Sequence, residues 1–217
     1  HAFKATGRKL PVNLVLIAEG EEEIASTNFP KVIANPEVAA ALKNTIGVIG
    51  ASALQSPQGV AGISLGAKGA VEFQLIVGGE TSDRYPKADV HSSTHARIES
   101  PVWRLVKALD TLVADDGHTP AIDGWFENVR PLTPRQKAII ADGLKGASEA
   151  EAKAQVGVGR WINDEDFQTS TERLLSQPTV NIQGLVSGYM GPGGKTVLPS
   201  RAEAKLEFRL VPDMTQA

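Results

Sequence analysis

The first 65 residues of the chain carry short apolar runs with little alternation. The two runs are residues 12–18 and 46–49, and Glu19-Gly20 follows the first. Runs of this kind are typical of strands that are buried on both faces of a parallel sheet. Asn35-Pro36 combines a cap residue with proline at the first helical position, which predicts a short helix as far as about Lys43. We therefore expect an α/β fold up to a domain boundary near residue 65.

From residue 66 onward, apolar residues alternate with polar ones or keep helical spacing. Period two over 71–77 and 202–211 predicts strands with one solvated face, and the second of these could lie at an exposed sheet edge. Helical spacing over 102–113 predicts the clearest helix, and another strand is expected from Val180. This part should be α+β, an antiparallel sheet with helices on one face. Three more helix starts are indicated by Thr133-Pro134, Ser148 with Glu151, and Thr169 with Glu172.

Composition excludes several classes of protein. The chain has no cysteine, which rules out disulfides and thiolate metal sites and fits a cytoplasmic location. Its net charge of −3 comes without a basic stripe interleaved with aromatics, so we expect no nucleic-acid partner. The apolar runs fall short of the ~20 residues that a membrane helix needs, so we expect no membrane partner. The chain opens at His1 and stops just after a strand pattern, which favours an internal fragment of a longer protein.

The densest charge is Glu19-Gly20-Glu21-Glu22-Glu23, four carboxylates in five residues. Sites in open α/β sheets collect at the carboxyl ends of strands, and this segment follows a predicted strand. Adjacent carboxylates at such a site can take different roles, since one can bind a cation while the other takes a proton from metal-bound water. The acidic first turn of a helix, favoured by the helix dipole, explains the same residues and is favoured on composition alone.

The histidines do not form the helical pair around a glutamate that marks the zinc-protease helix. His91 and His95 lie in a polar stretch that follows Asp89. A loop histidine can act as a ligand, as an acid or as a hydrogen-bond donor to an oxyanion. More often such a residue is a solvated surface side chain.

Two further features have alternative interpretations. Gly193-Gly194-Lys195-Thr196 suggests a phosphate-binding loop, but Tyr189 occupies the position of its first glycine and a strand follows, so a glycine-rich connection between strands is preferred. Arg209 falls on the polar face of the last predicted strand. It could form a fork with a substrate carboxylate or a cross-strand ion pair with a neighbouring acid, and the sequence does not favour either.

Three segments, taken in order, carry a family resemblance. They are Pro11-Val12-Asn13-Leu14 through Glu19 to Ser26, then Asp89-Val90-His91-Ser92, then Gly194 to Pro199 with Arg209-Leu210-Val211-Pro212. Together they resemble the signatures of the di-zinc metallopeptidase and amidohydrolase family that includes carnosinase (cytosolic non-specific dipeptidase), aminoacylase and succinyl-diaminopimelate desuccinylase. The resemblance spans residues 10–213.

The resemblance implies an enzyme, a zinc-dependent hydrolase that cleaves a peptide or N-acyl amino acid amide bond with metal-activated water. It implies Glu22 as general base and Glu23 as a zinc ligand. It implies that His91 reaches into the active site of the partner subunit and stabilises the developing oxyanion. Thr196 and Arg209 would hold the substrate, Arg209 by its carboxylate.

The same resemblance implies that residues 1–65 are part of the α/β metal-binding catalytic domain. Residues 66–217 would be most of the lid or dimerisation domain of a homodimer, a four-stranded antiparallel sheet with two helices, and 114–178 a helical insertion. The family's His-x-Asp motif and last histidine ligand have no counterpart here, and Ala51 stands where an aspartate ligand is expected. Serine follows His91-Ser92 where the family has glycine, and Ala25 also replaces a glycine.

These departures from the family pattern lead to one expectation about the chain alone and to one alternative function. The complete family site holds two zinc ions, but this chain alone is expected neither to retain them nor to be active. The alternative to a hydrolase fragment is a non-catalytic homologue or an isolated lid module that acts in dimerisation.

Overall fold

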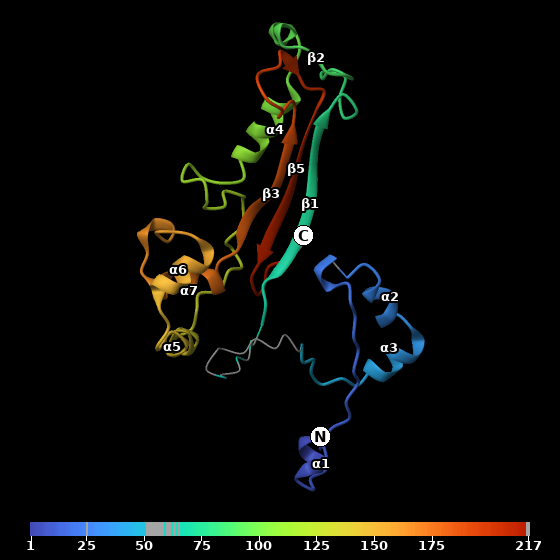
Figure 1. Cartoon of the computed structure of the whole chain (residues 1–217), viewed down its shortest axis with the longest axis vertical. Helices are drawn as coiled ribbons and strands as arrows, with labels where there is room; N and C mark the ends of the chain where they lie inside the picture. The colour runs from blue at the N-terminus through green and yellow to red at the C-terminus, as the bar shows by residue number, and fades with distance from the viewer. Residues whose placement is uncertain (25, 51–58, 60–61, 63, 65, 216–217) are drawn as a thin grey trace. The chain divides into compact units, whose positions relative to one another are not determined.

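The computed structural model of the chain describes residues 1–24, 26–50, 59, 62, 64 and 66–215 (Figure 1). Contacts divide the chain into two compact units, residues 1–63 and 64–217. Across the described residues, no helix is long and apolar enough to cross a membrane.

The second unit is built on a three-stranded antiparallel sheet. Its strands are β1 (Gly69–Gly78), β3 (Thr179–Ser187) and β5 (Arg201–Leu210), in the order β1-β5-β3. The strands expected at 71–77, from Val180 and at 202–211 are all present. The expectation that the last of these lies at a sheet edge is wrong, because β5 pairs with β1 on one side and with β3 on the other. The small and apolar side chains on one face of β5 suit a central strand, since a helix covers that face of the sheet.

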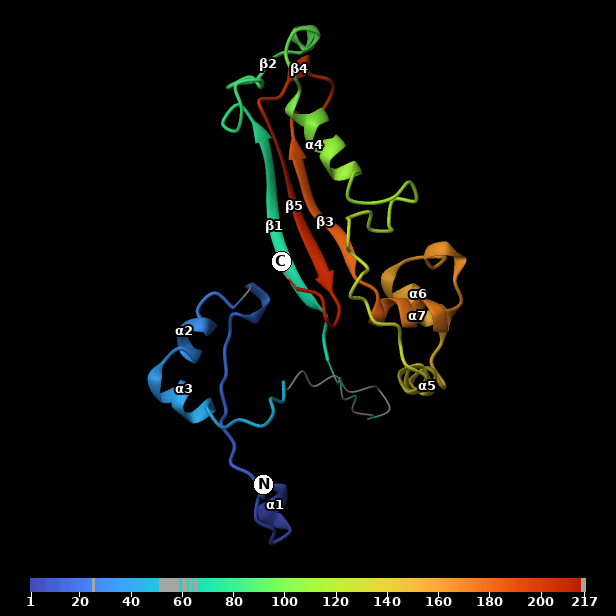
Figure 2. The same cartoon turned by 180° about the vertical axis from the view of Figure 1, so that it is seen from behind.

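That helix is α4 (Pro101–Asp110), which lies along one face of the sheet in both views (Figures 1 and 2). Ser100 caps it by accepting a hydrogen bond from the Trp103 N–H, and Pro101 takes the first turn, where its missing N–H costs nothing. Its inner side packs on the alternate residues of β5 that share one face. The buried core consists of Leu105, Leu109, Ala202, Ala204 and Leu206.

Helix α4 ends three residues before the expected Val113. Thr111 caps its C-terminus, and Val113 instead forms a β-bridge with Pro120, which closes a tight loop. Val113 is half-buried in this loop, and apolar spacing continues past the last residue of the helix, so the pattern alone does not reveal where the helix ends.

Three helices follow in the expected insertion, α5 (Pro134–Gly143), α6 (Glu149–Val156) and α7 (Phe167–Ser176), with the 3-10 turn η3 (Ile162–Asp164) before α7. Thr133 and Ser148 cap α5 and α6 as expected. Thr169 does not cap α7, because the Asp166 carboxylate accepts from the Thr169 N–H at 2.9 Å and the helix starts earlier. Helices α5 and α7 pack together, and all three lie near the end of the sheet opposite β2 and β4 (Figures 1 and 2).

The first unit contains α1 (Ala2–Ala5), η1 (Glu22–Ile24), α2 (Phe29–Ile33) and α3 (Pro36–Leu42). Asn35 caps α3 as expected. The strands expected at 12–18 and 46–49 are absent, and this expectation is wrong for the chain as it stands. Leu16 and Ile46 are 93% and 95% exposed. A strand needs neighbours for its backbone N–H and C=O groups, and the described residues of this unit provide no strand to pair with.

Candidate functional site

At one end of the sheet of unit 64–217, His91 and Thr196 come together. Strand β2 (Val90–His91) pairs with β4 (Val197–Leu198), so that His91 lies opposite Val197. The Ser92 N–H donates to the Thr196 carbonyl at 3.2 Å. Both His91 and Thr196 are exposed, so their side chains are open to a ligand.

Asp89 fixes this end of the molecule to the start of β5. One of its carboxylate oxygens accepts from the Ser200 N–H at 2.9 Å and from the Ser200 hydroxyl at 3.0 Å. These bonds, the backbone one above all, lower the pKa of Asp89 below its usual value. The aspartate of the Asp89-to-Ser92 segment therefore has a structural task, which is to hold the β2 turn against the strand that carries Arg201.

Glu99 links the loop before β2 to α4. Its carboxylate accepts from Arg84 at 3.0 Å and from Arg104 at 3.3 Å, and these bonds lower its pKa. The group is exposed, so this link contributes little to stability. The 3-10 turn η2 (Ser92–Ala96) lies between the two linked segments in the sequence.

The His91 ring caps η2. Its Nδ1 lies 3.2 Å from the Ser93 backbone nitrogen, which donates to it, and 2.8 Å from the Ser93 hydroxyl. The Thr94 hydroxyl donates to the His91 carbonyl at 2.6 Å. His91 is thus held by its own turn at Nδ1, while Nε2 makes no hydrogen bond among the described residues.

Arg209 lies at the other end of β5, opposite Ala70 on β1 and Thr179 on β3. Its guanidinium forms an ion pair with Glu207, whose residue is only 8% exposed. The acid lies two residues away on the same strand, and so the ion pair is not the cross-strand pair considered from the sequence. Lys68 is close by, and burial together with the charge of Arg209 lowers the pKa of Lys68.

Glu22 and Glu23 belong to η1 of the first unit, and both are exposed. Their neighbours hold the turn, since Glu19 accepts from the Ser26 hydroxyl at 3.0 Å and Glu21 accepts from the Asn28 N–H at 3.0 Å. Both interpretations of the acidic segment therefore remain predictions.

The described residues do not fit a zinc site by themselves. Among them, no group of three or more histidine, cysteine, aspartate or glutamate side chains could hold a metal ion. Catalytic zinc takes about three protein ligands, and only Glu23 has a counterpart among the ligands implied by the resemblance. Ala51 and Ala25 lie outside the described residues.

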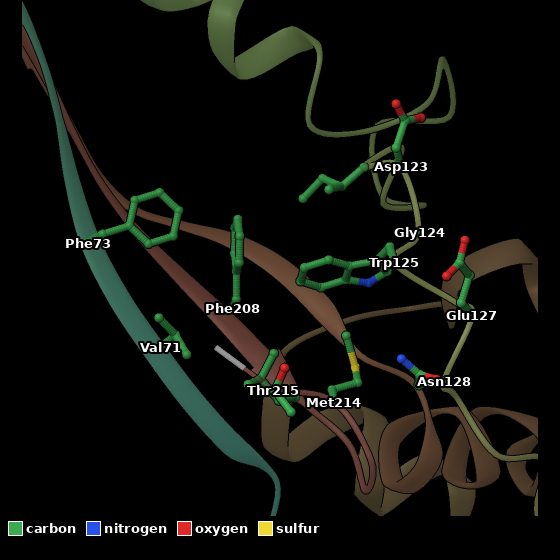
Figure 3. Close-up of a pocket in the computed structure, with 12 residues that line it drawn as sticks. Val71, Phe73, Asp123, Gly124, Trp125, Glu127, Asn128, Phe208, Met214 and Thr215 are labelled. Carbon is green, nitrogen blue, oxygen red and sulfur yellow. The ribbon is translucent and has the colours of Figure 1, made fainter. Parts of the chain in front are cut away.

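A pocket that the sequence does not predict lies on the α4 face of the sheet, near the Arg209 end. It has a volume of about 590 Å³. Phe208 stands edge-to-face between Phe73, at 4.7 Å, and Trp125, at 5.0 Å, as Figure 3 shows. The carboxylates of Asp123 and Glu127 point away from the sheet in that view. The lining that comes from the sheet is apolar, and the two carboxylates belong to the part of the lining that comes from the 122–128 segment.

Comparison with known proteins matches residues 65–217 to the peptidase dimerisation domain of the M20 peptidases. The chain is 30% identical over 214 residues to the Cys-Gly metallodipeptidase DUG1 of Saccharomyces cerevisiae, covering 98% of this chain and 42% of that protein. It is 29% identical over 221 residues to human Beta-Ala-His dipeptidase, covering 98% of this chain and 40% of that protein. The chain thus spans about two fifths of the length of these relatives.

Solved structures give the same result. An M20 family metallo-carboxypeptidase, Sso-CP2 from Sulfolobus solfataricus, matches with a TM-score of 0.63 and 35% identity, over 73% of this chain and 39% of that one. The di-peptidase Dug1p from Saccharomyces cerevisiae matches with a TM-score of 0.64 and 28% identity, over 99% of this chain and 43% of that one. The antiparallel sheet with its helices is the fold of the matched domain, and the chain belongs to the M20 metallopeptidase family, with residues 65–217 forming its peptidase dimerisation domain.

Proposed function

We propose that the chain is part of a zinc-dependent hydrolase of peptide or N-acyl amino acid amide bonds. In this proposal, residues 64–217 join two subunits and supply substrate-holding groups to both active sites. His91 and Thr196 act in the active site of the partner subunit, and Arg209 acts in that of its own subunit. The observation that carries this proposal is the separation of these groups to opposite ends of β5.

The length of β5 supports the assignment of His91 and Arg209 to different active sites. Arg201 is the residue after Ser200, which bonds to Asp89 near His91. Eight residues along β5 separate Arg201 from Arg209. At ~3.3 Å per residue, this is about 26 Å along the strand. An extended dipeptide spans only about 7 Å. One substrate therefore does not reach both ends of one subunit, whereas two copies of the chain can bring unlike ends together.

The free edge of β3 is the proposed contact between the copies. Among the described residues this strand pairs only with β5, so one row of its backbone groups is open to another strand. Ile182 and Leu185 lie opposite Leu206 and Ala204, which places them on the α4 side of the sheet. They are 47% and 54% exposed, although both are apolar. An open edge bordered by exposed apolar side chains is typical of a protein–protein contact.

The chemistry proposed for Glu22 and Glu23 rests on the resemblance. Glu22 would be the general base and Glu23 a metal ligand in the whole protein. Because the described residues do not fit a two-zinc site, we expect the 217-residue chain alone neither to retain two zinc ions nor to hydrolyse dipeptides.

The second candidate function is dimerisation without catalysis, by a non-catalytic homologue or an isolated module. Ala51, which stands where the resemblance places an aspartate ligand, supports this alternative, whereas the intact Glu22-Glu23 pair supports the hydrolase. Counting zinc bound by the purified whole protein and assaying a dipeptide panel separates the two, because only the hydrolase would show turnover that a chelator abolishes.

The experiment that tests the first proposal couples assembly to turnover. In the whole protein, Leu185→Lys should give monomers by sedimentation and lose dipeptide hydrolysis. The control is Val186→Lys on the same strand. Val186 is also exposed but lies opposite Glu203 on the other face, so this variant should remain dimeric and active. A monomeric Leu185→Lys variant that keeps wild-type turnover would contradict the proposal.

A further inference from the structure

The contact between Ser93 and the His91 ring defines where the ring carries its hydrogen. The Ser93 backbone N–H donates to Nδ1 at 3.2 Å. A backbone N–H has no lone pair to offer, so Nδ1 must be the acceptor. Neutral imidazole has one N–H, and His91 must therefore carry it on Nε2.

The Ser93 hydroxyl strengthens this choice. It lies 2.8 Å from the same Nδ1, which is closer than the backbone nitrogen. With Nδ1 unprotonated, the hydroxyl is the donor in this contact as well. Two donors from one residue thus converge on one ring nitrogen. If the hydrogen moved from Nε2 to Nδ1, the backbone N–H would be repelled, and the hydroxyl would have to give up its donated bond and accept instead.

We propose that Ser93 is a positioning residue that holds His91 as the neutral Nε2–H tautomer, so that Nε2 is ready to donate to a substrate oxyanion. The inference rests on the proposed function, in which His91 stabilises the oxyanion. A fixed donor that is aimed before the reaction costs no reorganisation as charge develops. A neutral imidazole can serve in this way without first taking up a proton.

A second histidine in the same turn provides an internal reference. The His95 Nδ1 lies 3.2 Å from the Ile98 carbonyl oxygen. A carbonyl can only accept, so the His95 hydrogen belongs on Nδ1. The two rings, four residues apart, are therefore expected to be opposite tautomers.

Nitrogen-15 NMR of the histidine rings in the full chain tests the assignment directly. At about pH 8.5, where an ordinary histidine is neutral, His91 should show a protonated Nε2 and His95 a protonated Nδ1. Ser93→Ala removes the hydroxyl and should lower the His91 tautomer ratio about fivefold, the size expected for one neutral hydrogen bond. Ser93→Thr retains a hydroxyl and should preserve the ratio, as should the neighbouring control Ser92→Ala.

Turnover by the whole protein provides the second readout. Ser93→Ala should lower kcat for a dipeptide severalfold, by no more than the about fivefold change in the tautomer ratio, with little change in KM, because the contact acts on the developing oxyanion and not on the bound ground state. Ser92→Ala should leave both constants unchanged. A His91 protonated on Nδ1, a ratio unchanged in Ser93→Ala, or an unchanged kcat in an active protein would overturn the inference. A wild-type whole protein without turnover would overturn the proposed function and leave the tautomer assignment standing.

Discussion

Segments with strand-like apolar patterns are buried in one unit of the chain and exposed in the other. In the second unit, Ala204 and Leu206 of β5 are fully buried, because β1 and β3 flank the strand and α4 covers it. In the first unit, Leu16 and Ile46 belong to continuous apolar runs that also predict strands, and both are almost fully exposed. An apolar run becomes a strand only where neighbours accept its backbone groups. The dimerisation unit contains its own neighbours, whereas the described part of the first unit does not.

The largest expected effect concerns the chemistry assigned to the first unit. In the whole protein, Glu22→Gln should lower kcat ~10²–10⁴-fold while bound zinc is retained, because glutamine keeps the shape but cannot take a proton. Glu23→Gln should instead release metal. Both side chains are exposed, so neither change should unfold this chain. If both variants kept their zinc and hydrolysed substrate at near-normal rates, the roles of Glu22 and Glu23 would be misassigned.

Core substitutions provide the most direct contrast between the units. Leu206→Ala should lower the free energy of unfolding of the second unit by about 2–5 kcal/mol, because it leaves a cavity under α4. Leu16→Ala in the first unit should change the free energy of unfolding by less than about 0.5 kcal/mol, since the Leu16 side chain is already in water. Denaturant unfolding followed by circular dichroism measures both. Equal effects would mean that the first unit has a core of its own.

The smallest effect tests a polar contribution to the second unit. Hydrogen bonds from the Thr119 hydroxyl, then from the Thr119 and His118 N–H groups, lower the pKa of Asp116 to about 2. A lowered folded-state pKa stabilises the fold above the usual value of 3.8, and this contribution is lost as the pH falls from about 4 to about 2.

Asp116→Asn should therefore weaken the acid dependence of the unfolding midpoint in that pH window. The neighbouring exposed carboxylate provides the control, and Asp115→Asn should leave the acid dependence as it is in the wild type. Identical acid profiles for Asp116→Asn and the wild type would exclude this contribution.

Much of the second unit is predictable from sequence because its signals are local. Ser100-Pro101 marks the start of α4, and period two marks β1 and β5. What the sequence does not show is pairing. Nothing local indicates that β5 is central, or that the pairing of β2 with β4 brings His91 to Thr196. The sequence also does not show which of several nearby polar residues caps a helix. Asp166, for example, caps α7 in place of Thr169.

The pocket shows a further limit of local signals. Trp125 lies in a stretch without periodicity, yet its ring packs on Phe208. Trp125, one of two tryptophans in the insertion, is itself the signal that could have pointed to this contact. Among the expected site residues, those implied by family resemblance keep their assigned roles only as proposals, since the roles depend on groups beyond the described residues.

The central claim is that His91 and Thr196 serve the partner's active site while Arg209 serves its own, and subunit mixing tests it most directly. His91→Ala and Arg209→Ala whole proteins should each be inactive. After subunit exchange, each mixed dimer should contain one intact site, which restores about a quarter of wild-type turnover in a random mixture. Mixing His91→Ala with Thr196→Ala should restore nothing, because both groups come from the same end of the same subunit. Activity recovered by the second pair, or none recovered by the first despite confirmed exchange, would contradict the account.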